Sequence, residues 1–418
     1  MTSSVRPSRR LRVGMISATA SPLTPPGGSG AGGQNVHVEA LATALARRGH
    51  DVRVYTRRDD PGLPDVVQTA AGVRVVHVPA GPAETLARED LLPFLPEFGR
   101  WLAGRWAEGE PPDVLHAHFW LSGVAALEAA KSRADGRIPV SVTFHALGGV
   151  PRRGQDGEGL PARRAGFEPL VARLADRIVA RSGDEVDELL RLGVARSRIE
   201  VVPSGVDIRL FLPGPQGPAD RPLGRPARLL SVGRLAERKG HADVIRVLRA
   251  LPGAELFIAG GPPRYALPSD PYARELRTAA TAYGVADRVH LLGAVPRAQM
   301  PGLYRGVDVV VCTPSREPSG LTPLESMACG TPVVAYALGG LTDMVVHGTC
   351  GLLVEPGDVV ALARALKSLL DCEPLRYAYG VGGLQRVLAR YPWPRIAEQI
   401  EATYRGLIRT RIAVPVAA

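Results

Sequence analysis

Two glutamates stand eight residues apart in the second half of the chain, Glu317 in a glycine-bearing loop and Glu325 further on. The loop follows the apolar segment Val307–Cys312, which has the composition of a buried strand. Carboxylates accept paired hydroxyl protons, such as those of a ribose or a hexose. Each glutamate alone has an ordinary explanation, a capping box for Glu325 and a solvated loop for Glu317. Their combination favours a site for a hydroxyl-rich ligand.

A helix is predicted to begin within the same stretch. Thr322 is a suitable N-cap, a proline follows it, and Glu325 stands three positions past the cap. Gly330 is a suitable helix end. The free N–H groups at such a helix start attract phosphate.

Two basic residues follow another strand candidate, Arg228–Gly233. Arg234 and Lys239 are close enough in sequence to reach a diphosphate together, although a solvated basic turn is the ordinary explanation. The chain has only two other lysines, Lys131 and Lys367, and otherwise uses arginine. A lysine retained here suggests that a compact ammonium is needed.

A glycine-rich loop, Gly27–Gly33, precedes the helix candidate Asn35–Arg48 and would let the backbone approach a ligand closely. It lacks the G-x-G-x-x-G spacing, which argues against a nicotinamide dehydrogenase. His145 ends the strand candidate Val140–His145. A lone histidine there is more often structural, unless a cleft places it on a substrate.

The elements that must position these residues alternate between short apolar strands and longer amphipathic helices, which predicts parallel sheets covered on both faces. The strands expected besides those above are Leu11–Ser17, Val52–Thr56, Val73–Val78, Val114–His118, Arg177–Ala180, Ile199–Val202, Glu255–Ala259, Arg288–Leu292 and Pro332–Ala335. The helices expected besides Asn35–Arg48 include Asp184–Leu192, His241–Ala250 and Val359–Leu370.

The segment Phe211–Ala227 interrupts the alternation with prolines and glycines and is interpreted as a linker. We therefore predict two tandem Rossmann-like domains, residues 1–212 and 222–390, with ligands bound in the cleft between them. A helix at 391–410 completes the chain. The apolar stripe in Leu91–Trp106 favours a helix packed on a sheet or a partner over one that lies on a membrane.

Composition limits the class of protein. The net charge of +10 comes from basic residues spread along the chain, which argues against nucleic-acid binding. No run approaches the roughly eighteen apolar residues of a membrane span, and Arg12 interrupts a stretch that mimics a signal peptide. These features predict a cytoplasmic protein with small-molecule partners and no stable membrane insertion. A homodimer is left open.

Four cysteines are few for this chain length, which fits a reducing compartment, and none has a partner at metal-ligand spacing. We interpret them as core residues: Cys312, Cys329, Cys350 and Cys372.

Taken together, these motifs resemble family 4 of the retaining glycosyltransferases, which have the two-domain GT-B fold. The resemblance spans nearly the whole chain. It rests on the spacing of the two glutamates, on the upstream Arg234 and Lys239, and on Gly32–Gly33 and His145. It also includes two longer segments, Val202–Asp207 and Trp393–Tyr404. In that family the last helix crosses back to the first domain.

The resemblance implies roles for individual residues. Glu325 would hold the nucleotide ribose, Glu317 and His145 would contact the transferred sugar, and Arg234 and Lys239 would stabilise the leaving diphosphate. Backbone at the glycine loop and at the helix start would assist, through Gly33, Gly320, Leu321 and Thr322. Many members carry phenylalanine where this chain has Ser319, which we expect to alter loop packing only.

The same resemblance implies a mechanism without a side-chain base or a cofactor. The nucleotide sugar is a co-substrate, attack occurs on the face that the diphosphate leaves, and the leaving phosphate oxygen takes the acceptor proton. The chain has no D-x-D motif, so no bound metal is expected.

Within the family the chain is most similar to enzymes that transfer N-acetylglucosamine from UDP to inositol phosphate. The similarity lies in His116–Gly123, Ala80–Pro82 and Ala259–Pro262. In those enzymes a lysine, a tyrosine, a threonine and an arginine hold the acceptor phosphate. The matching positions are Arg88, Phe119, Ala146 and either Arg163 or Arg164, and Asn35 is also assigned to the acceptor side.

Two hydroxyl donors are therefore missing from the predicted phosphate site, and each is worth about 1–3 kcal/mol. The sequence thus favours an unphosphorylated cyclitol such as 2-deoxystreptamine, in antibiotic biosynthesis, as the acceptor of N-acetylglucosamine. Transfer to inositol phosphate and mannosyl transfer from GDP-mannose to a lipid or glycan remain alternatives. A non-catalytic nucleotide-sugar binder on the same fold is the alternative of another class.

Overall fold

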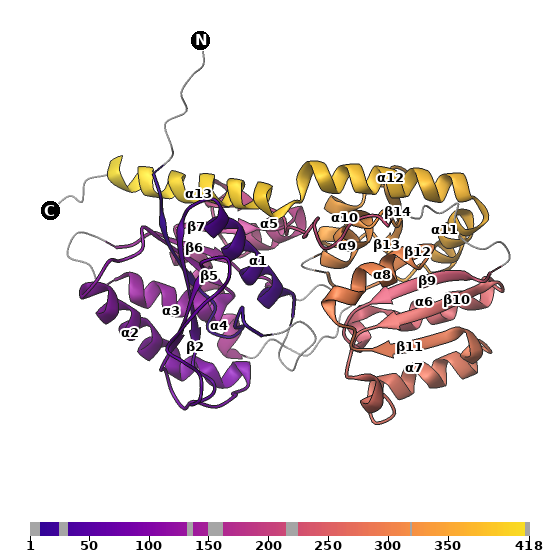
Figure 1. Cartoon of the computed structure of the whole chain (residues 1–418), viewed down its shortest axis with the longest axis horizontal. Coiled ribbons are helices and arrows are strands. Elements are labelled where there is room, and N and C mark those ends of the chain that lie inside the picture. The colour runs from indigo at the N-terminus through magenta and orange to yellow at the C-terminus, as the bar shows by residue number, and fades with distance from the viewer. Residues whose placement is uncertain are drawn as a thin grey trace, which may run out of the picture.

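The computed structural model describes residues 9–24, 32–131, 137–148, 162–214, 225–317 and 320–413 of the 418-residue chain. These residues form two sheets, one in each half of the chain, and helices cover both faces of each sheet (Figure 1). The strands are apolar on both faces because helices pack on each side, as the sequence predicts.

The N-terminal sheet has the strand order β3-β4-β2-β1-β5-β6-β7-β8, and every neighbouring pair is parallel except β3 and β4. Its strands are β1 (Arg12–Ile16), β2 (Asp51–Arg57), β3 (Val66–Gln68), β4 (Arg74–Val78), β5 (Val114–His118), β6 (Val140–Thr143), β7 (Arg177–Ala180) and β8 (Ile199–Val201). Its helices are α1 (Gly33–Arg47), α2 (Leu95–Ala107), α3 (Trp120–Ala130), α4 (Ala162–Leu174) and α5 (Gly183–Arg191).

The C-terminal sheet has the order β11-β10-β9-β12-β13-β14 and is parallel throughout. Its strands are β9 (Ala227–Val232), β10 (Ala254–Ala259), β11 (Val289–Gly293), β12 (Val309–Cys312), β13 (Val333–Tyr336) and β14 (Gly351–Val354). Its helices are α6 (His241–Val247), α7 (Pro271–Ala282), α8 (Met300–Arg305), α9 (Leu321–Ala328), α10 (Gly340–Met344), α11 (Val359–Asp371) and α12 (Glu373–Arg390).

Each sheet reverses its strand order next to its first strand. In the N-terminal sheet the reversal lies between β1 and β5, and in the C-terminal sheet it lies between β9 and β12. Ligands of such sheets bind outside the carboxyl ends of the strands at this point, where neighbouring loops diverge. A ligand site is therefore expected among the residues that follow β1, β5, β9 and β12.

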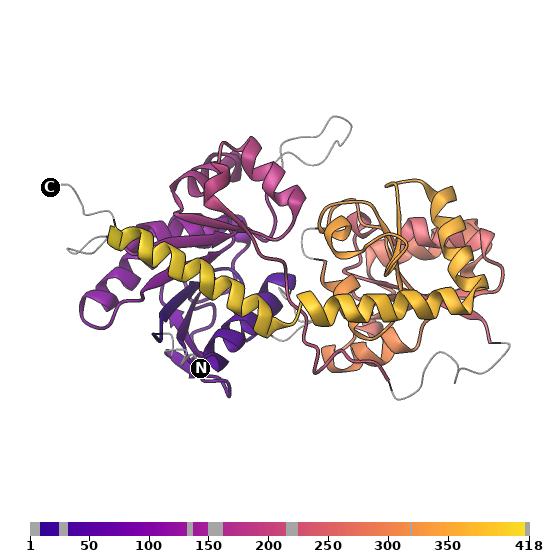
Figure 2. The same ribbon diagram turned by 90° about the horizontal axis from the view of Figure 1, so that it is seen from above.

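The last helix, α13 (Trp393–Ala413), leaves the C-terminal half of the chain and lies along the N-terminal sheet (Figure 2). It is separated from α12 by Tyr391 and Pro392, and the N–H of Val206 donates to the carbonyl of Tyr391 at 2.8 Å. Trp393 and Tyr404 of α13 are buried against α1 and the sheet. The predicted return of the chain to the first domain is confirmed.

The sequence places every predicted strand within two residues of its observed bounds. β3 and β14 have no predicted counterpart because they are short, and β3 is an exposed edge strand. Phe211, with which the predicted linker begins, is 1% exposed and packs in the C-terminal core against Tyr304. Residues 215–224 of that segment lie outside the described residues.

The apolar segment Leu91–Trp106 is not one helix. Its first part belongs to the 3-10 helix η1 (Arg88–Phe94), which contains Pro93, and α2 begins at Leu95. Phe98, Leu102 and Trp106 are buried, and α2 packs against α3, as a stripe of core residues should. In the part of the chain that the structure describes, no helix has the length and apolarity to cross a membrane.

Glu401 fastens α13 to the end of α1. Its carboxylate accepts hydrogen bonds from Arg48 and Arg405, each at 2.8 Å, and lies 3.2 Å from Nε2 of His50. Burial raises the pKa of Glu401, but these three partners outweigh burial and bring the pKa to about 2. Ionised Glu401 therefore stabilises the fold at pH 7, and this contribution is lost as the pH falls from about 4.5 towards 2.

We predict that Glu401→Gln lowers the free energy of unfolding at pH 7 by about 2 kcal/mol, because charged hydrogen bonds are replaced by neutral ones. Urea denaturation followed by circular dichroism measures the difference. The difference in the free energy of unfolding between the variant and the wild type should shrink as the pH is lowered below 4.5. The exposed Glu398 on the same helix supplies the control variant Glu398→Gln, which should match the wild type at both pH values.

Candidate active site

Glu317 lies in the loop after β12 and is 9% exposed. Its Oε2 is 2.7 Å from Nζ of Lys239, and its Oε1 accepts a 3.0 Å hydrogen bond from the N–H of Gly320. Gly320 has a φ of 59°, and a Cβ there would lie 2.0 Å from Sδ of Met344, so the turn requires glycine. The structure thus joins two predicted site residues that are 78 positions apart.

Lys239 ends the 3-10 helix η4 (Glu237–Lys239), and the glycine after it fixes the position of this loop. Gly240 has a φ of 70°, and a Cβ there would lie 1.7 Å from the carbonyl oxygen of Thr313. The hydroxyl of Thr313 donates to the Gly240 carbonyl at 2.8 Å. The loop after β9 is therefore held against the end of β12, which carries Lys239 to Glu317.

Arg234 is exposed at the start of the same loop, and its carbonyl is 3.2 Å from Nε2 of His241. Two further arginines, Arg238 and Arg316, were not predicted for this site. Arg238 lies close enough to Arg234 and Arg316 for their charges to act on it. Burial lowers the pKa of Arg238, the charges of Arg234 and Arg316 lower it further, and Glu317 opposes them. The loops that follow β9 and β12 thus bring several basic side chains near the carboxylate of Glu317. Such a group of cations suits an anionic ligand.

The prediction that Thr322 caps the next helix is wrong. α9 begins at Leu321, and its N-cap is Gly320, which adopts the left-handed conformation that brings the chain back to Glu317. Gly330, with a φ of 78°, directly follows the helix end, as predicted. Pro318 and Ser319 lie outside the described residues.

Glu325 is not part of a capping box. Its Oε1 lies 2.8 Å from Nη1 of Arg297, and its Oε2 accepts a 2.8 Å hydrogen bond from the hydroxyl of Tyr304. Burial raises the pKa of Glu325, while Arg297 and Tyr304 lower it. Neither partner was predicted, although Arg297 opens η8 (Arg297–Gln299) shortly after the end of β11, where a site residue is expected.

His145 lies in the N-terminal domain, two residues past β6 rather than within a strand. It has a φ of 60°, which is rare for a residue with a Cβ. Its Nε2 is 2.9 Å from Nδ1 of His118, and its carbonyl accepts a hydrogen bond from Arg181. Burial first, then the charge of Arg181, lowers the pKa of His145, so the ring is neutral at pH 7.

Residues from both domains meet beside this site. Nη2 of Arg316 donates to the carbonyl of Leu147 and is 3.4 Å from Glu188. The N–H of Gly183, the first residue of α5, donates to Oδ2 of Asp343 at 2.7 Å. The loop that carries Glu317 therefore also contacts the loop that follows His145.

The glycine-rich loop is described only from Gly32 onward. α1 begins at Gly33, and Asn35 uses its side chain to fasten the helix start. Its Oδ1 accepts from the N–H of Gly32 at 3.1 Å, and its Nδ2 donates to the carbonyl of Ser21 at 2.9 Å. Asn35 thus shapes the loop after β1.

Four of the predicted acceptor residues lie together: Arg88, Phe119, Ala146 and Arg164. Phe119, which follows β5 with a φ of 80°, has the guanidinium carbons of Arg88 and Arg164 at 5.5 Å and 5.2 Å from its ring centroid. Arg164 also donates to the carbonyl of Ala146 and is 2.7 Å from Glu168. Arg163 is exposed. Of the two arginines left open by the sequence, Arg164 is the one that contacts both Phe119 and Ala146.

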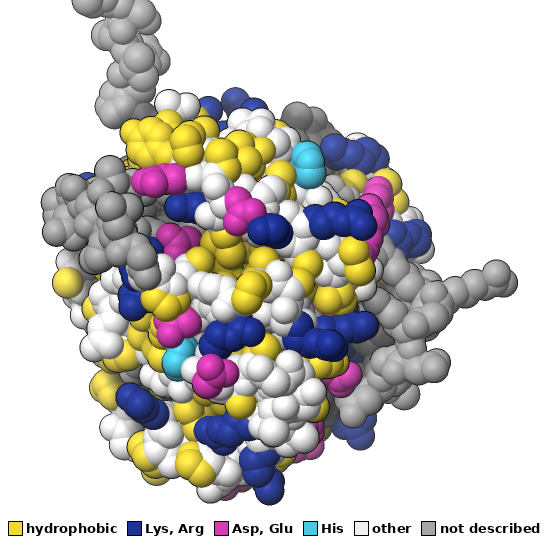
Figure 3. Space-filling model, turned by 90° about the vertical axis from the view of Figure 1, so that its right-hand side faces the viewer, with side chains coloured by type: hydrophobic (Ala, Val, Ile, Leu, Met, Phe, Trp, Pro, Cys, Tyr) yellow, Lys and Arg dark blue, Asp and Glu magenta, His cyan; other side chains and the backbone are white. Residues whose placement is uncertain are grey.

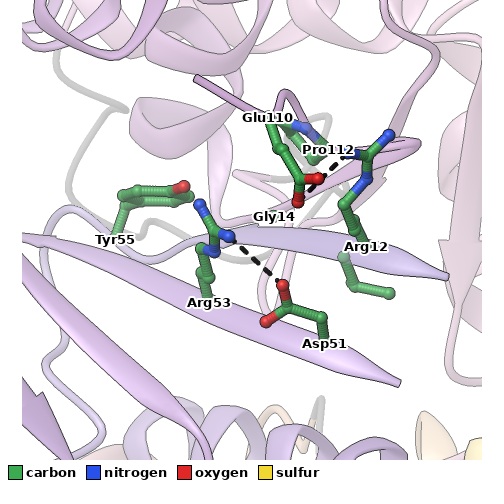
Figure 4. Close-up of a pocket in the computed structure, with 8 residues that line it drawn as sticks. Arg12, Gly14, Asp51, Arg53, Tyr55, Glu110 and Pro112 are labelled. Atoms are coloured by element: carbon green, nitrogen blue, oxygen red, sulfur yellow. Dashed lines mark hydrogen bonds and ion pairs between the residues drawn. The ribbon is translucent and has the colours of Figure 1, made fainter. Parts of the chain in front are cut away.

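A small crevice lies beside β1 and β2 towards the end of the N-terminal sheet at which these strands begin (Figure 4). Its walls carry the ion pairs of Arg12 with Glu110, at 3.3 Å, and of Arg53 with Asp51, at 3.2 Å. It is remote from the carboxyl ends of the strands. On the end of the C-terminal domain that Figure 3 shows, basic side chains are mixed with acidic and apolar ones.

The residues that the structure describes contain no group of three His, Cys, Asp or Glu arranged to hold a metal ion. Three cysteines are buried, as predicted, but Cys372 is exposed and the core interpretation is wrong for it.

Two family models match the chain. "Glycosyltransferase Family 4" covers residues 31–210, and "Glycosyl transferases group 1" covers residues 219–385. Among curated relatives, D-inositol 3-phosphate glycosyltransferase 1 of Catenulispora acidiphila is 37% identical, over 95% of this chain and 96% of the relative. The D-inositol 3-phosphate glycosyltransferase of Thermobispora bispora is 38% identical, over 97% of each chain.

The fold has solved counterparts. Sucrose-phosphate synthase from Thermosynechococcus elongatus superposes with a TM-score of 0.83, at 30% identity, over 96% of this chain and 100% of that one. HepE of Anabaena, solved in complex with UDP and glucose, superposes with a TM-score of 0.72 at 20% identity, over 95% of this chain and all of its own, and supports the fold alone. These matches confirm the two-domain architecture expected from the sequence.

Burial raises the pKa of Cys312, beside Glu317, and of Cys329 to about 12, and it also raises the pKa of Cys350. We predict that in the folded protein at pH 8 only Cys372 reacts rapidly with a thiol reagent such as DTNB, because the thiolate is the reactive form. Absorbance at constant protein concentration should report one fast thiol, and four after unfolding. Rapid labelling of the Cys372→Ser variant would contradict this.

Proposed function

Because the chain belongs to the family 4 glycosyltransferases of GT-B fold and is a hexosyltransferase, we propose that it transfers N-acetylglucosamine from UDP-N-acetylglucosamine to D-inositol 3-phosphate. The acceptor is taken from the names of the relatives, which are 35–38% identical over nearly their full length. Those names support the inositol phosphate alternative of the sequence analysis. They give no support to 2-deoxystreptamine or to a place in antibiotic biosynthesis.

The observation that carries the proposal is the pair of guanidinium groups at Phe119. Phe119 and Ala146 lack the hydroxyl groups that hold the acceptor phosphate in similar enzymes. On the sequence alone, this loss of two hydrogen-bond donors disfavours a phosphorylated acceptor. Arg88 and Arg164 instead bring two guanidinium groups to one ring, and Glu168 pairs with Arg164 at 2.7 Å. A guanidinium can bind a phosphate with two parallel N–H groups, where a lysine acts as a point charge. The cation pair therefore compensates for the lost hydroxyls.

In the proposed reaction the donor lies on the C-terminal domain. Glu325 binds the ribose, while Lys239 and Arg234 stabilise the diphosphate as the bond from the sugar C1 to its β-phosphate oxygen breaks. The acceptor hydroxyl oxygen attacks C1 from the face that UDP leaves, and its proton passes to the leaving phosphate oxygen. The products are UDP and the glycoside with retained configuration. Glu317 and His145 hold hydroxyls of the sugar from opposite domains.

The ion pair between Lys239 and Glu317 has a consequence for this scheme. At 2.7 Å the carboxylate offsets the charge of Lys239 and holds its ammonium near the end of β12. A donor that binds both residues would bring its anionic diphosphate to Lys239 and the neutral hydroxyls of its hexose to Glu317. The pair thus orients the two groups before the donor arrives.

We predict that Glu317→Ala leaves the fold intact and lowers kcat by at least about 100-fold, because hydrogen bonds to the sugar that strengthen in the transition state are lost. UDP release measured with purified enzyme gives the rate, and the thermal midpoint reports folding. Near-normal turnover by this variant would remove Glu317 from the site. Glu355→Ala, on the C-terminal domain at an exposed loop, is the control for loss of one acidic residue.

The acceptor assignment predicts a selectivity. With UDP-N-acetylglucosamine as donor, D-inositol 3-phosphate should be used at least about 100-fold better than 2-deoxystreptamine, measured as kcat/KM by mass spectrometry, because the arginine pair binds its phosphate. Arg88→Met should raise the KM for D-inositol 3-phosphate about 10- to 100-fold and leave the KM for the donor unchanged.

Arg105→Met is the matched control, because Arg105 also stacks on an aromatic ring, that of Trp101 at 5.5 Å, but on α2. A preference for 2-deoxystreptamine, or equal use of free inositol and its phosphate, would overturn the acceptor. Turnover with GDP-mannose alone would overturn the donor, and tight donor binding without turnover would indicate a binder.

A further inference from the structure

A second histidine lies behind His145 and has no assigned role. His118 is the last residue of β5 and is fully buried, and its Nδ1 is 2.9 Å from Nε2 of His145. The two rings are tilted by 35° with centroids 5.2 Å apart. Because β5 and β6 are parallel neighbours, with His118 paired to Thr143, their carboxyl ends place these two side chains side by side.

The backbone of His145 is fixed independently of its ring. Arg181, which is 3% exposed, donates to the His145 carbonyl and is itself 3.6 Å from Glu185. This holds the left-handed backbone conformation, which is unfavourable for a residue with a Cβ. With the backbone held, the remaining freedom of His145 is the orientation of its imidazole.

The ring orientation depends on His118. A neutral imidazole has one N–H and one bare nitrogen, so one ring of the pair donates and the other accepts. In the described structure Nδ1 of His145 and Nε2 of His118 are buried and have no hydrogen-bond partner. Turning the His145 ring over would break its hydrogen bond to His118 and leave another nitrogen unsatisfied. The bond therefore selects one ring orientation and gives Nδ1 a defined role as donor or acceptor.

His118 is in turn supported from behind. Its ring packs against that of His116, with centroids 4.3 Å apart and a tilt of 34°. Both nitrogens of His116 bond to hydroxyls, Nδ1 to Tyr404 at 2.7 Å and Nε2 to Thr143 at 2.9 Å. Burial lowers the pKa of both His118 and His116, the latter to about 3. The support is thus neutral and rigid.

We propose that His118 is a positioning residue for glycosyl transfer: its hydrogen bond fixes the orientation and tautomer of His145, the residue that contacts the transferred sugar in the proposed function. The proposal rests on the proposed function, since it takes from it that His145 contacts the sugar. It adds a residue that does not touch the substrate and acts through its hydrogen bond to His145.

The test compares two substitutions at one position. His118→Phe keeps a ring of similar volume and removes the bond, whereas His118→Asn keeps a polar group that can bond to Nε2 of His145. His118→Phe should lower kcat about 10- to 100-fold with a change in donor KM below about 3-fold, because a misdirected catalytic contact costs rate more than binding. His118→Asn should stay within about 3-fold of wild type in kcat, since the bond is kept.

Equal rates for His118→Phe and the wild type would overturn the proposal, and so would equal losses in both folded variants. A measurement on the wild type covers the case in which His118→Phe does not fold. Long-range 1H–15N spectra of the imidazoles should show His118 and His145 as single neutral tautomers from pH 6 to 8. A charged ring or a rapidly averaged mixture of tautomers at His145 would overturn the proposal.

The acceptor and the positioning role fail separately. If the wild type does not glycosylate D-inositol 3-phosphate, the acceptor proposal is wrong, and the two variants are compared by the hydrolysis of UDP-N-acetylglucosamine in the absence of acceptor. The same ratio between His118→Phe and His118→Asn is expected there, because His145 contacts the donor sugar in either reaction. A ratio near one in hydrolysis would count against His118.

Discussion

The parallel pairing of β12 with β9 is the constraint on which the candidate site depends. Parallel neighbours end at the same edge of the sheet, so the loops that follow them start a few ångströms apart although 78 residues separate Lys239 from Glu317. Gly240 then lets the first loop touch the carbonyl of Thr313, and Gly320 turns the second loop back towards its own glutamate. A Cβ at Gly240 would clash with the Thr313 carbonyl of the other loop, and a Cβ at Gly320 would clash with Met344 and disturb the turn that holds Glu317.

The two domains provide different electrostatics for one reaction. The C-terminal side offers permanent cations near one carboxylate, which suits a leaving diphosphate. The N-terminal side offers imidazoles that burial holds neutral, which suits hydrogen bonding to sugar hydroxyls without repelling a developing positive charge. Helix α13 links the two sides, because Trp393 packs against His37 and Tyr404 bonds to His116. Docking of this helix therefore supports the histidine cluster as well as the domain.

The sequence predicts the strands, and it predicts that Lys239 and Glu317 belong to one site, because these follow from apolar runs and from residues at strand ends. It does not predict that Gly320 caps α9, since a left-handed cap depends on the space beside Met344 and on Glu317, not on local preference. It misses Arg297 and Tyr304 for a similar reason: they reach Glu325 from η8 and α8, segments with no motif of their own. Buried polar partners are set by tertiary packing, and residue spacing carries little information about them.

Phe119 shows why counting donors from a sequence can mislead. Replacing a hydroxyl by a phenyl ring removes a hydrogen bond, but the ring also provides a face on which guanidinium groups settle. Arg88 and Arg164 both lie over it, and Phe119 follows the end of β5 with a positive φ. Hydroxyl donors on shorter side chains are thus replaced by the planar, charged guanidinium groups of longer side chains. Under the proposed function, the arginines at this ring would hold the phosphate of the acceptor in place of the lost hydroxyls.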